Sequence, residues 1–346
     1  MDLMKAAVLR KPMDIRIEDV EVPKPSGLEV LLRVESVGLC HTDVHIWEGH
    51  YGPIRIEERG VKFPLIMGHE IAGRVEELGE GVKGFRKGDK VVVYPWIGEG
   101  TCAACLSGNE HLCYSLKPLG ILQPGGYAEY VLVPSYRYLI PIKDLDPDQA
   151  CSMACAGITA YSAVKKANVK PDENLVLIGI GGLGHIALQI AKAALNPKII
   201  AVDVREESLE LAEKMGADYT INASKVNVVD EVKRLTNGLG AEAVIDFVNT
   251  TETSLQGFDS LRRGGRLVLV GLHGHYSKFI LPLIPLKAAK ILGSYTGSLK
   301  DLVEVLKLLG RGIIKLTAIK RSLSEVNELL KDVRDGKIVG RVVMKP

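Results

Sequence analysis

The sequence predicts an α/β protein that combines a β-rich domain with a domain built on a doubly wound parallel sheet. Up to about residue 150, short candidate strands are separated by glycine and proline, whereas from about residue 170 apolar strands alternate with helices. The length of 346 residues fits about two domains. Hydrophobic residues make up 47% of the chain and charged residues 25%, a balance that excludes a largely disordered protein.

The first half is expected to be all β. Its clearest candidate strands are Glu29–Glu35, Glu70–Glu76 and Asp89–Tyr94, in which valine, isoleucine and leucine recur. Turn residues such as Pro25 and Gly79 separate these segments.

The second half begins with a βαβ unit. An apolar run at Asn174–Ile178 predicts a buried strand, the segment from Gly182 to Leu195 predicts a helix, and Lys198–Val202 predicts the next strand. A charged helix from Glu206 to Met215 follows and ends at Gly216. This alternation is typical of a doubly wound sheet.

The remaining elements complete that pattern. Further strands are expected at Ala243–Val248, Arg266–Val270 and Ile291–Tyr295. Two amphipathic helices, Lys300–Leu309 and Ser324–Arg334, precede a last β-like run at Ile338–Met344.

Charge and hydropathy exclude two classes of partner. Lys and Arg total 44 against 42 for Asp and Glu, so the net charge of +2 provides no broad basic surface for nucleic acid. The N-terminal residues show no apolar stretch typical of a signal peptide, and the most apolar segment, Leu175 to Leu195, is interrupted by glycines and polar residues. We therefore expect a cytoplasmic protein with no nucleic acid or membrane partner.

A glycine-rich string predicts a dinucleotide site. Gly179, Gly181, Gly182, Leu183 and Gly184 form G-x-G-x-x-G between a predicted strand and a predicted helix. This context lets a pyrophosphate approach the backbone and meet a helix N-terminus.

The next strand ends with an acidic residue. Asp203 lies where a carboxylate can accept hydrogen bonds from the adenosine ribose hydroxyls, and its charge would repel the extra phosphate of NADP. NAD is therefore favoured, although Arg205 could partly accommodate that phosphate. A purely structural glycine turn with a solvated aspartate is the alternative.

Three cysteines cluster within twelve residues. Cys102, Cys105 and Cys113 have the tight spacing that structural zinc prefers. Glu99 is the expected fourth ligand, with Glu110 or His111 as competitors. A redox pair is the other reading, but it would leave Cys113 unexplained.

Scattered residues resemble a known family when they are taken in order. They are Cys40-His41-Thr42-Asp43-Val44-His45, Gly68-His69-Glu70 and Cys151-Ser-Met-Ala-Cys155. Together with the cysteine loop and the glycine string, they resemble the zinc-containing medium-chain alcohol dehydrogenases from end to end. The segment from Gly68 to Val82 is similar to the zinc signature of that family.

Two further strings resemble the tetrameric, NAD-dependent archaeal members. They are Tyr94-Pro-Trp-Ile-Gly-Glu99-Gly and Val202-Asp-Val-Arg-Glu-Glu207. The chain departs from most of the family at Glu99, where a cysteine is usual.

The resemblance implies a GroES-like catalytic domain interrupted by a Rossmann domain. The expected catalytic domain spans 1–154 and 297–346 and includes a structural zinc loop at 98–114, and the Rossmann domain spans 155–296. A homotetramer is also implied.

The resemblance also implies the ligands of a catalytic zinc. They are Cys40, His69 and Cys155, with one position open for water or substrate. Glu70 would lie close to the metal, and Asp43 would accept the other ring N–H of His69. Two zinc ions per chain are therefore expected, one catalytic and one structural.

The implied reaction is the reversible oxidation of primary or secondary alcohols to aldehydes or ketones, with hydride transfer to NAD. Thr42 and His45 would carry the alcohol proton toward solvent. His41 and Arg341 would hold the pyrophosphate, and Thr159 would support the nicotinamide. Four apolar residues are candidates for the substrate pocket, with simple core or interface packing as the alternative: Trp47, Trp96, Leu119 and Leu272.

Two alternatives to this function stay open. The string from Thr42 to Glu48 resembles the corresponding segment of L-threonine dehydrogenase, which points to an amino-alcohol or polyol substrate. A zinc-stabilised NAD-binding sensor without catalysis is the second alternative. An intact set of Cys40, His69 and Cys155 argues against the sensor, because such a protein need not retain an open metal site.

Overall fold

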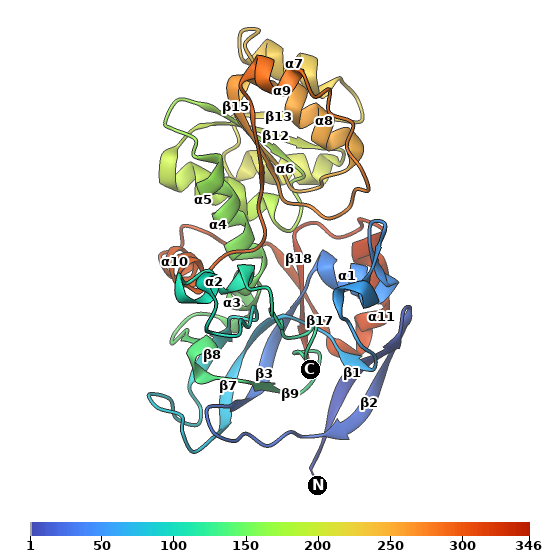
Figure 1. The fold of residues 1–346 in the computed structure, drawn as a ribbon, viewed down its shortest axis with the longest axis vertical. Helices are drawn as coiled ribbons and strands as arrows, with labels where there is room; N and C mark the ends of the chain where they lie inside the picture. The colour runs from blue at the N-terminus through green and yellow to red at the C-terminus, as the bar shows by residue number, and fades with distance from the viewer. Residues whose placement is uncertain (1) are drawn as a thin grey trace. The chain divides into compact units, whose positions relative to one another are not determined.

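The computed structural model describes residues 2–346, which form two compact units (Figure 1). Unit 1 contains the chain up to Ile158 together with Gly297–Pro346, and unit 2 is Thr159–Thr296. The chain therefore leaves unit 1 once and returns to it for its last segment.

A seven-stranded sheet forms the centre of unit 1. Its strands follow the order β10-β8-β7-β3-β18-β17, and β9 pairs with one end of β3. The strand bounds are β3 (Val30–Leu39), β7 (Glu70–Leu78), β8 (Lys90–Val93), β9 (Tyr130–Val133), β10 (Leu139–Pro141), β17 (Ala318–Ser322) and β18 (Arg341–Lys345). The C-terminal strand β18 thus lies between β3 and β17, antiparallel to the first and parallel to the second.

Smaller strands complete the β structure of unit 1. The order β2-β1-β6 forms a three-stranded sheet, and β4 pairs with β5. Their bounds are β1 (Leu3–Lys11), β2 (Asp14–Glu21), β4 (His50–Tyr51), β5 (Ile54–Arg55) and β6 (Leu65–Ile66).

The expectation that the first half is all β is wrong in detail, because it contains helices. The longest that lies wholly within it is α1 (His41–Glu48), whose first turn is capped by Asp43 and which ends at Gly49 in the left-handed conformation. Five consecutive buried residues on α1 hide any helical periodicity in the sequence. The other helices of unit 1 are α2 (Ala103–Leu106), α3 (Pro147–Ala150), α10 (Leu299–Gly310) and α11 (Val326–Arg334), and α4 (Ala156–Ala167) runs from unit 1 into unit 2.

A short 3₁₀ turn explains one further difference from the sequence prediction. The predicted helix from Ser324 begins instead at Val326, because Leu323–Glu325 form a 3₁₀ turn capped by Ser322. Other 3₁₀ turns in unit 1 are Ile56–Arg59, Glu110–Leu112, Tyr136–Tyr138 and Cys151–Ala154. The last of these leads directly to Cys155.

Unit 2 contains the predicted doubly wound parallel sheet. Its six strands follow the order β13-β12-β11-β14-β15-β16 and all pair in parallel. The strand bounds are β11 (Asn174–Ile178), β12 (Lys198–Asp203), β13 (Tyr219–Asn222), β14 (Ala241–Asp246), β15 (Leu261–Leu269) and β16 (Lys290–Gly293). The strand order reverses between β11 and β14, the place where such sheets bind ligands.

Helices connect the strands of unit 2. They are α5 (Gly184–Leu195), α6 (Glu206–Lys214), α7 (Val228–Leu235), α8 (Thr251–Asp259) and α9 (Leu283–Lys287). Figure 1 shows α7, α8 and α9 grouped together. The core of this unit consists of buried aliphatic side chains from neighbouring strands, including Val176, Ile200 and Val244. Such near-continuous apolar runs are typical of strands covered on both faces.

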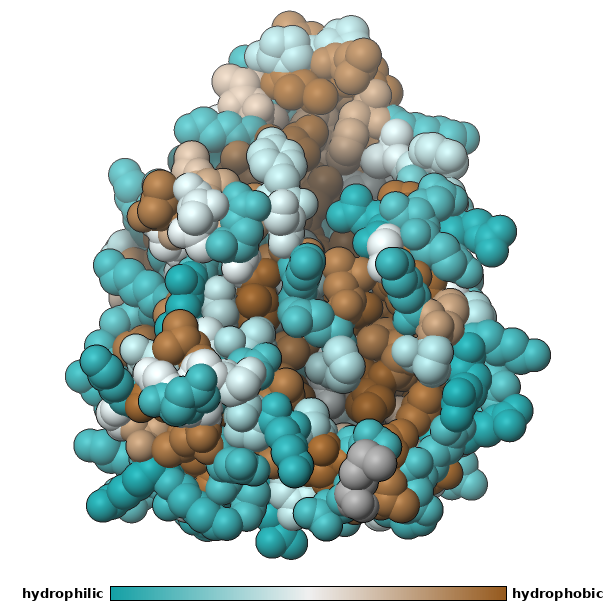
Figure 2. Space-filling view, turned by 60° about the horizontal axis from the view of Figure 1, so that its bottom comes forward, coloured by the Kyte–Doolittle hydropathy of each residue, from teal (hydrophilic) through white to brown (hydrophobic). Residues whose placement is uncertain are grey.

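Hydrophilic residues cover much of the face drawn in Figure 2, and hydrophobic residues are visible between them and at the top of the view. Among the described residues, no helix is long and apolar enough to cross a membrane.

Candidate functional site

Four residues predicted from distant parts of the sequence converge in unit 1. The ligand atoms of Cys40, His69, Glu70 and Cys155 all lie within 4.8 Å of one another, and all four residues are buried. The Sγ atoms of Cys40 and Cys155 are 4.0 Å apart. Cys40 follows β3, His69 and Glu70 stand at the start of β7, and Cys155 follows the 3₁₀ turn Cys151–Ala154. The sheet pairing of β3 with β7 therefore brings three of the four together.

Asp43 holds two of these residues. Its Oδ1 atom lies 3.2 Å from Nδ1 of His69, and its Oδ2 atom accepts the backbone N–H of Cys40 at 2.9 Å. Because the carboxylate accepts at Nδ1, the His69 ring is placed to present Nε2 to the Cys40 side of the site. The predicted role of Asp43 toward His69 is thus consistent with this geometry.

Tyr127 also contacts Asp43, and the sequence analysis did not identify it. Its hydroxyl donates to Asp43 Oδ2 at 3.0 Å, and the residue is fully buried. A Cβ atom at Gly68 would lie 2.2 Å from the Tyr127 ring, and Gly68 has a φ of +90°, so this position requires glycine. No local spacing links Tyr127 to the Cys40 segment, so only the fold reveals this contact.

Glu70 and Arg341 form a buried ion pair. A guanidinium N–H of Arg341 donates to Glu70 Oε1, and both side chains are almost fully enclosed. Burial raises the pKa of Glu70, and the Arg341 charge opposes that rise. Arg341, predicted as a partner of the cofactor pyrophosphate, is thus placed on strand β18 with its charge compensated within unit 1.

The two thiols of the group differ in their tendency to ionise. The hydrogen bond with Cys155 lowers the pKa of Cys40 well below its ordinary value, and His69 and Arg341 act in the same direction. The same hydrogen bond, together with burial, raises the pKa of Cys155. Burial lowers the pKa of His69, but Asp43 and Cys40 together outweigh burial and the net shift is upward.

The four residues fit a zinc ion. Nε2 of His69 and Oε2 of Glu70 are buried and have no hydrogen-bond partner among the described residues. A buried polar atom without a partner costs free energy unless it binds something. Two thiols and one imidazole are also the ligand types that zinc prefers in catalytic sites that keep a position open.

The residues predicted for proton transfer lie on α1, next to this group. Thr42 is half-buried, and His45 is 6% exposed, so His45 is not a surface histidine. The His45 ring lies 5.4 Å from the exposed His41 ring and 5.4 Å from the Tyr51 ring, measured between centroids.

The two tryptophans predicted to line the substrate pocket are both buried. The Trp96 ring lies 5.8 Å from His69, and its indole N–H donates to the Ala154 carbonyl at 3.2 Å. Arg334 lies over the Trp47 ring at 5.7 Å. Trp96 therefore stands beside the predicted ligands, whereas Trp47 packs α1 against α11.

The cysteine loop forms a second group in unit 1. Cys102, Cys105 and Cys113 have their Sγ atoms within 4.8 Å of one another, with Cys102 at 3.5 Å from Cys105 and 3.7 Å from Cys113. Burial disfavours the thiolate of Cys113, but the backbone N–H groups of Glu99 and Ser115, together with the neighbouring thiols, outweigh burial and lower its pKa. Three clustered thiols with such donors fit a structural zinc ion.

The carboxylate of Glu99 does not belong to that group in this structure. Glu99 is exposed, and its backbone N–H lies 3.5 Å from Cys113 Sγ. The competitor Glu110 is buried and pairs through Oε1 with Arg137, and His111 is also buried.

The glycine string of unit 2 lies between β11 and α5, as the sequence predicts. A Cβ atom at Gly181 would meet no atom within 4 Å, so open space lies next to the backbone there. Asp203 ends β12, and its carboxylate accepts the backbone N–H of Ile180 at 2.8 Å and of Arg205 at 3.0 Å. An acidic side chain thus lies directly beside the loop, which fits the adenosine half of a dinucleotide. Thr159, predicted to support the nicotinamide, is buried on α4.

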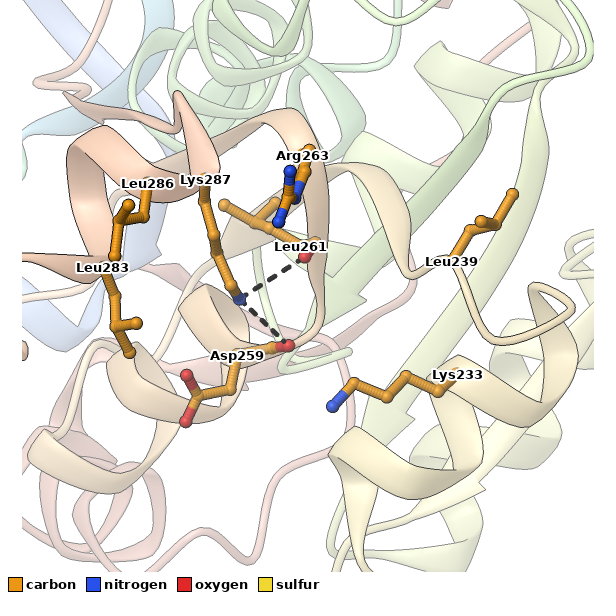
Figure 3. Close-up of a pocket in the computed structure, with 8 residues that line it drawn as sticks. All are labelled: Lys233, Leu239, Asp259, Leu261, Arg263, Leu283, Leu286 and Lys287. Atoms are coloured by element: carbon orange, nitrogen blue, oxygen red, sulfur yellow. Dashed lines mark hydrogen bonds between the residues drawn. The ribbon is translucent and has the colours of Figure 1, made fainter.

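A cavity of about 390 Å³ in unit 2 contains none of the predicted site residues (Figure 3). It is lined by Lys233, Leu239, Asp259, Leu261, Arg263, Leu283, Leu286 and Lys287. The Lys287 ammonium donates to the carbonyls of Phe258, Asp259 and Leu261, at 3.0, 3.4 and 3.4 Å. Lys287 therefore satisfies carbonyls at the end of α8, a structural role.

Comparison with known proteins identifies the relatives of this chain. The family model described as the alcohol dehydrogenase GroES-like domain matches residues 26–144, and that of the zinc-binding dehydrogenases matches residues 182–311. A protein of Sulfurisphaera tokodaii named NAD-dependent alcohol dehydrogenase is 46% identical, with all of each chain covered.

Solved structures give the same result. The alcohol dehydrogenase of Aeropyrum pernix is 36% identical, with a TM-score of 0.93, over 99% of this chain and 100% of that chain. The D-arabinose dehydrogenase of Sulfolobus solfataricus is 34% identical, with a TM-score of 0.87 over all of both chains. The fold class and the family predicted from the sequence are therefore confirmed, and the chain belongs to the zinc-binding alcohol dehydrogenase family with its GroES-like domain.

Proposed function

We propose that this protein is an NAD-dependent zinc alcohol dehydrogenase, which reversibly oxidises primary or secondary alcohols to aldehydes or ketones. The observation that carries the proposal is the buried group of Cys40, His69, Glu70 and Cys155, in a chain that also has a dinucleotide loop. The names of the relatives support both the cofactor and the reaction.

Cys40, His69 and Cys155 would hold the catalytic zinc, with Glu70 close by. When bound, zinc supplies a Lewis acid that lowers the pKa of the alcohol hydroxyl, and NAD supplies the acceptor of the hydride. The low pKa of Cys40 favours a thiolate, the form that binds metal.

The chain's own residues would then remove the proton of the alcohol. Thr42, which follows Cys40 and His41 in the chain, would accept this proton, and His45, about one turn further along α1, would pass it on. An imidazole suits this step because its charge changes near neutral pH.

NAD is the proposed cofactor. Gly179, Gly181, Gly182, Leu183 and Gly184 would bind the pyrophosphate, and Asp203 would accept the ribose hydroxyls. Arg205, whose Nε atom lies 3.8 Å from Asp203, is partly neutralised and therefore less available to a further phosphate. His41, Arg341 and Thr159 are the remaining proposed contacts.

A second, structural zinc is proposed in the cysteine loop, with Cys102, Cys105 and Cys113 as ligands. Glu99 is the proposed fourth ligand, because its backbone already approaches Cys113 and an exposed carboxylate is free to turn. Both zinc sites need reduced thiols, which favours the cytoplasm as the location. A homotetramer is proposed from the family resemblance alone, and a mass measurement in solution tests it.

The decisive experiment is an assay of NADH formation at 340 nm with primary, secondary and cyclic alcohols. L-Threonine and D-arabinose belong in the same panel, because of the sequence likeness near Thr42 and of the sugar dehydrogenase among the structural neighbours. Turnover of simple alcohols supports the proposal. Turnover of L-threonine or D-arabinose but of no simple alcohol would show that the substrate is an amino alcohol or a sugar. NAD binding without any turnover would favour a sensor.

A further inference from the structure

We propose that Tyr127 is a positioning residue of the catalytic zinc site. Its hydroxyl fixes the Asp43 carboxylate and, through Asp43, the imidazole of His69 and the backbone of Cys40. The inference rests on the proposed function, because it assigns Tyr127 a role toward the metal that this function requires.

The contacts of one carboxylate carry the argument. Asp43 is fully buried and accepts at 3.0 Å from Tyr127, at 2.9 Å from the Cys40 backbone and at 3.2 Å from the His69 ring. Two of these three partners belong to residues that would bind zinc. A buried carboxylate needs donors, and Tyr127 supplies the one that belongs to neither ligand residue. The hydroxyl therefore sets where the carboxylate lies without competing for the metal.

The Tyr127 side chain has two separable parts. Its ring fills the space in which a Cβ atom of residue 68 would lie, directly before His69. Its hydroxyl reaches Asp43. A phenylalanine at position 127 would keep the ring against Gly68 and remove only the hydrogen bond, so Tyr127→Phe isolates the proposed role.

Tyr94 provides a matched control. It is also fully buried in unit 1, and its hydroxyl donates to the Gly297 carbonyl at 2.8 Å rather than to the Asp43 group. Tyr94→Phe therefore also removes a buried tyrosine hydrogen bond without touching Asp43. Both variants are expected to lower the melting temperature, but only Tyr127→Phe should change the metal site.

The measurement is zinc release from the purified full-length protein to a chromophoric chelator. The phase that is absent in Cys155→Ala reports the Cys40 site. Outer partners of metal-binding histidines typically change affinity by 10–100-fold. We expect Tyr127→Phe to weaken zinc binding in that phase by about tenfold. Tyr94→Phe should leave the phase unchanged.

A double-mutant cycle tests whether Tyr127 acts through Asp43. In the Asp43→Ala background, Tyr127→Phe should change zinc affinity by less than about twofold, because no acceptor remains at position 43 to link Tyr127 to His69. An unchanged release phase in Tyr127→Phe overturns the inference, as does an equal loss in Tyr94→Phe or full additivity in the cycle. If the wild-type protein binds no zinc at the Cys40 site and oxidises no alcohol, the proposed function is wrong, and the inference about Tyr127 is then wrong as well.

Discussion

Cys155 belongs to the proposed catalytic zinc site and Cys105 to the proposed structural zinc site. Replacing each in turn should show that the two sites have different roles. Cys155→Ala is expected to lose one zinc ion and more than about 10³-fold of turnover while the protein stays folded, because a catalytic ligand is removed. Cys105→Ala should lose the other zinc ion and mainly stability. Metal analysis, thermal unfolding and the alcohol assay check this together. Equal loss of activity and stability in both variants would contradict the division.

Asp203 is expected to set the choice of cofactor. Asp203→Gly should reduce the preference for NAD over NADP by about tenfold or more, because it removes both the acceptor for the ribose and the charge that repels phosphate. The carboxylate also accepts two backbone N–H groups, so Asp203→Gly could disturb the loop itself. Asp203→Asn keeps an acceptor oxygen for these groups and removes only the charge, so it serves as the control for that disturbance. The ratio of kcat/KM for the two cofactors is the measurement. A wild-type preference for NADP would show that Arg205 dominates instead.

His45 is expected to export the proton of the alcohol. His45→Gln should slow alcohol oxidation at neutral pH by on the order of 10²-fold, and less at alkaline pH, where hydroxide can take the proton. Turnover between about pH 6 and pH 10 is the measurement, with a solvent isotope effect to show that proton transfer limits the rate. The exposed His50, in the next strand, provides a control as His50→Gln. A pH profile identical in His45→Gln and wild type would remove His45 from the proton path.

Some individual site residues could be predicted from the sequence and others could not. The cysteine loop and the glycine string are local, so their spacing alone indicated their chemistry. Cys40, His69 and Cys155 are far apart in the chain and were identified only through the family resemblance. Tyr127 has no such signal, because its contact with Asp43 depends on where the fold places two distant segments.

At the scale of elements, Asp148 joins α3 to three strands of the main sheet. It contacts Ser36 of β3 at 2.5 Å, Lys320 of β17 at 2.5 Å and Lys345 of β18. Burial opposes its ionisation, but the two lysines and the serine outweigh burial and lower the pKa of Asp148 to about 2. This carboxylate therefore helps to hold the C-terminal strands in the sheet.

The shift gives a pH-dependent prediction. Because the folded pKa lies below the ordinary value of 3.8, the stabilisation is fully present above about pH 4 and disappears as the pH falls toward 2. Asp148→Asn should lower the free energy of unfolding at neutral pH by about 1–2 kcal/mol, a value reduced because the lysines are exposed. The difference from wild type should shrink between about pH 4 and pH 2 in denaturant titrations. Asp144→Asn, at an exposed position nearby, should show neither effect.

The predictability of elements also differed between the units. In unit 2, the strand Asn174–Ile178 and the end of α5 at Leu195 agree with the sequence prediction, because buried parallel strands and their helices have clear apolar patterns. In unit 1, α1 was missed because its residues are buried on nearly all sides. Its helical state depends on packing and on the Asp43 cap rather than on an amphipathic pattern.

At the scale of the whole molecule, metal removal should affect the two units differently. Both proposed zinc sites lie in unit 1, whereas the glycine loop and Asp203 lie in unit 2. Treatment with a chelator is therefore expected to lower the unfolding temperature of unit 1 by on the order of 10 °C. The affinity for ADP should change by less than about twofold, because ADP needs only the adenosine site. Calorimetry and titration with ADP are the measurements, and loss of ADP binding on demetallation would contradict this separation.

The position of β18 also determines when the protein can fold during synthesis. Unit 2 is one continuous stretch of chain, so it can fold as soon as it has left the ribosome. Unit 1 must wait, because β18 fits between β3 and β17 and carries Arg341, the buried partner of Glu70. A nascent chain therefore leaves one edge of β3 unpaired until β18 has emerged, and unpaired strand edges are prone to aggregation. Binding of the proposed catalytic zinc next to a Glu70 that is compensated by Arg341 would accordingly have to follow the synthesis of β18.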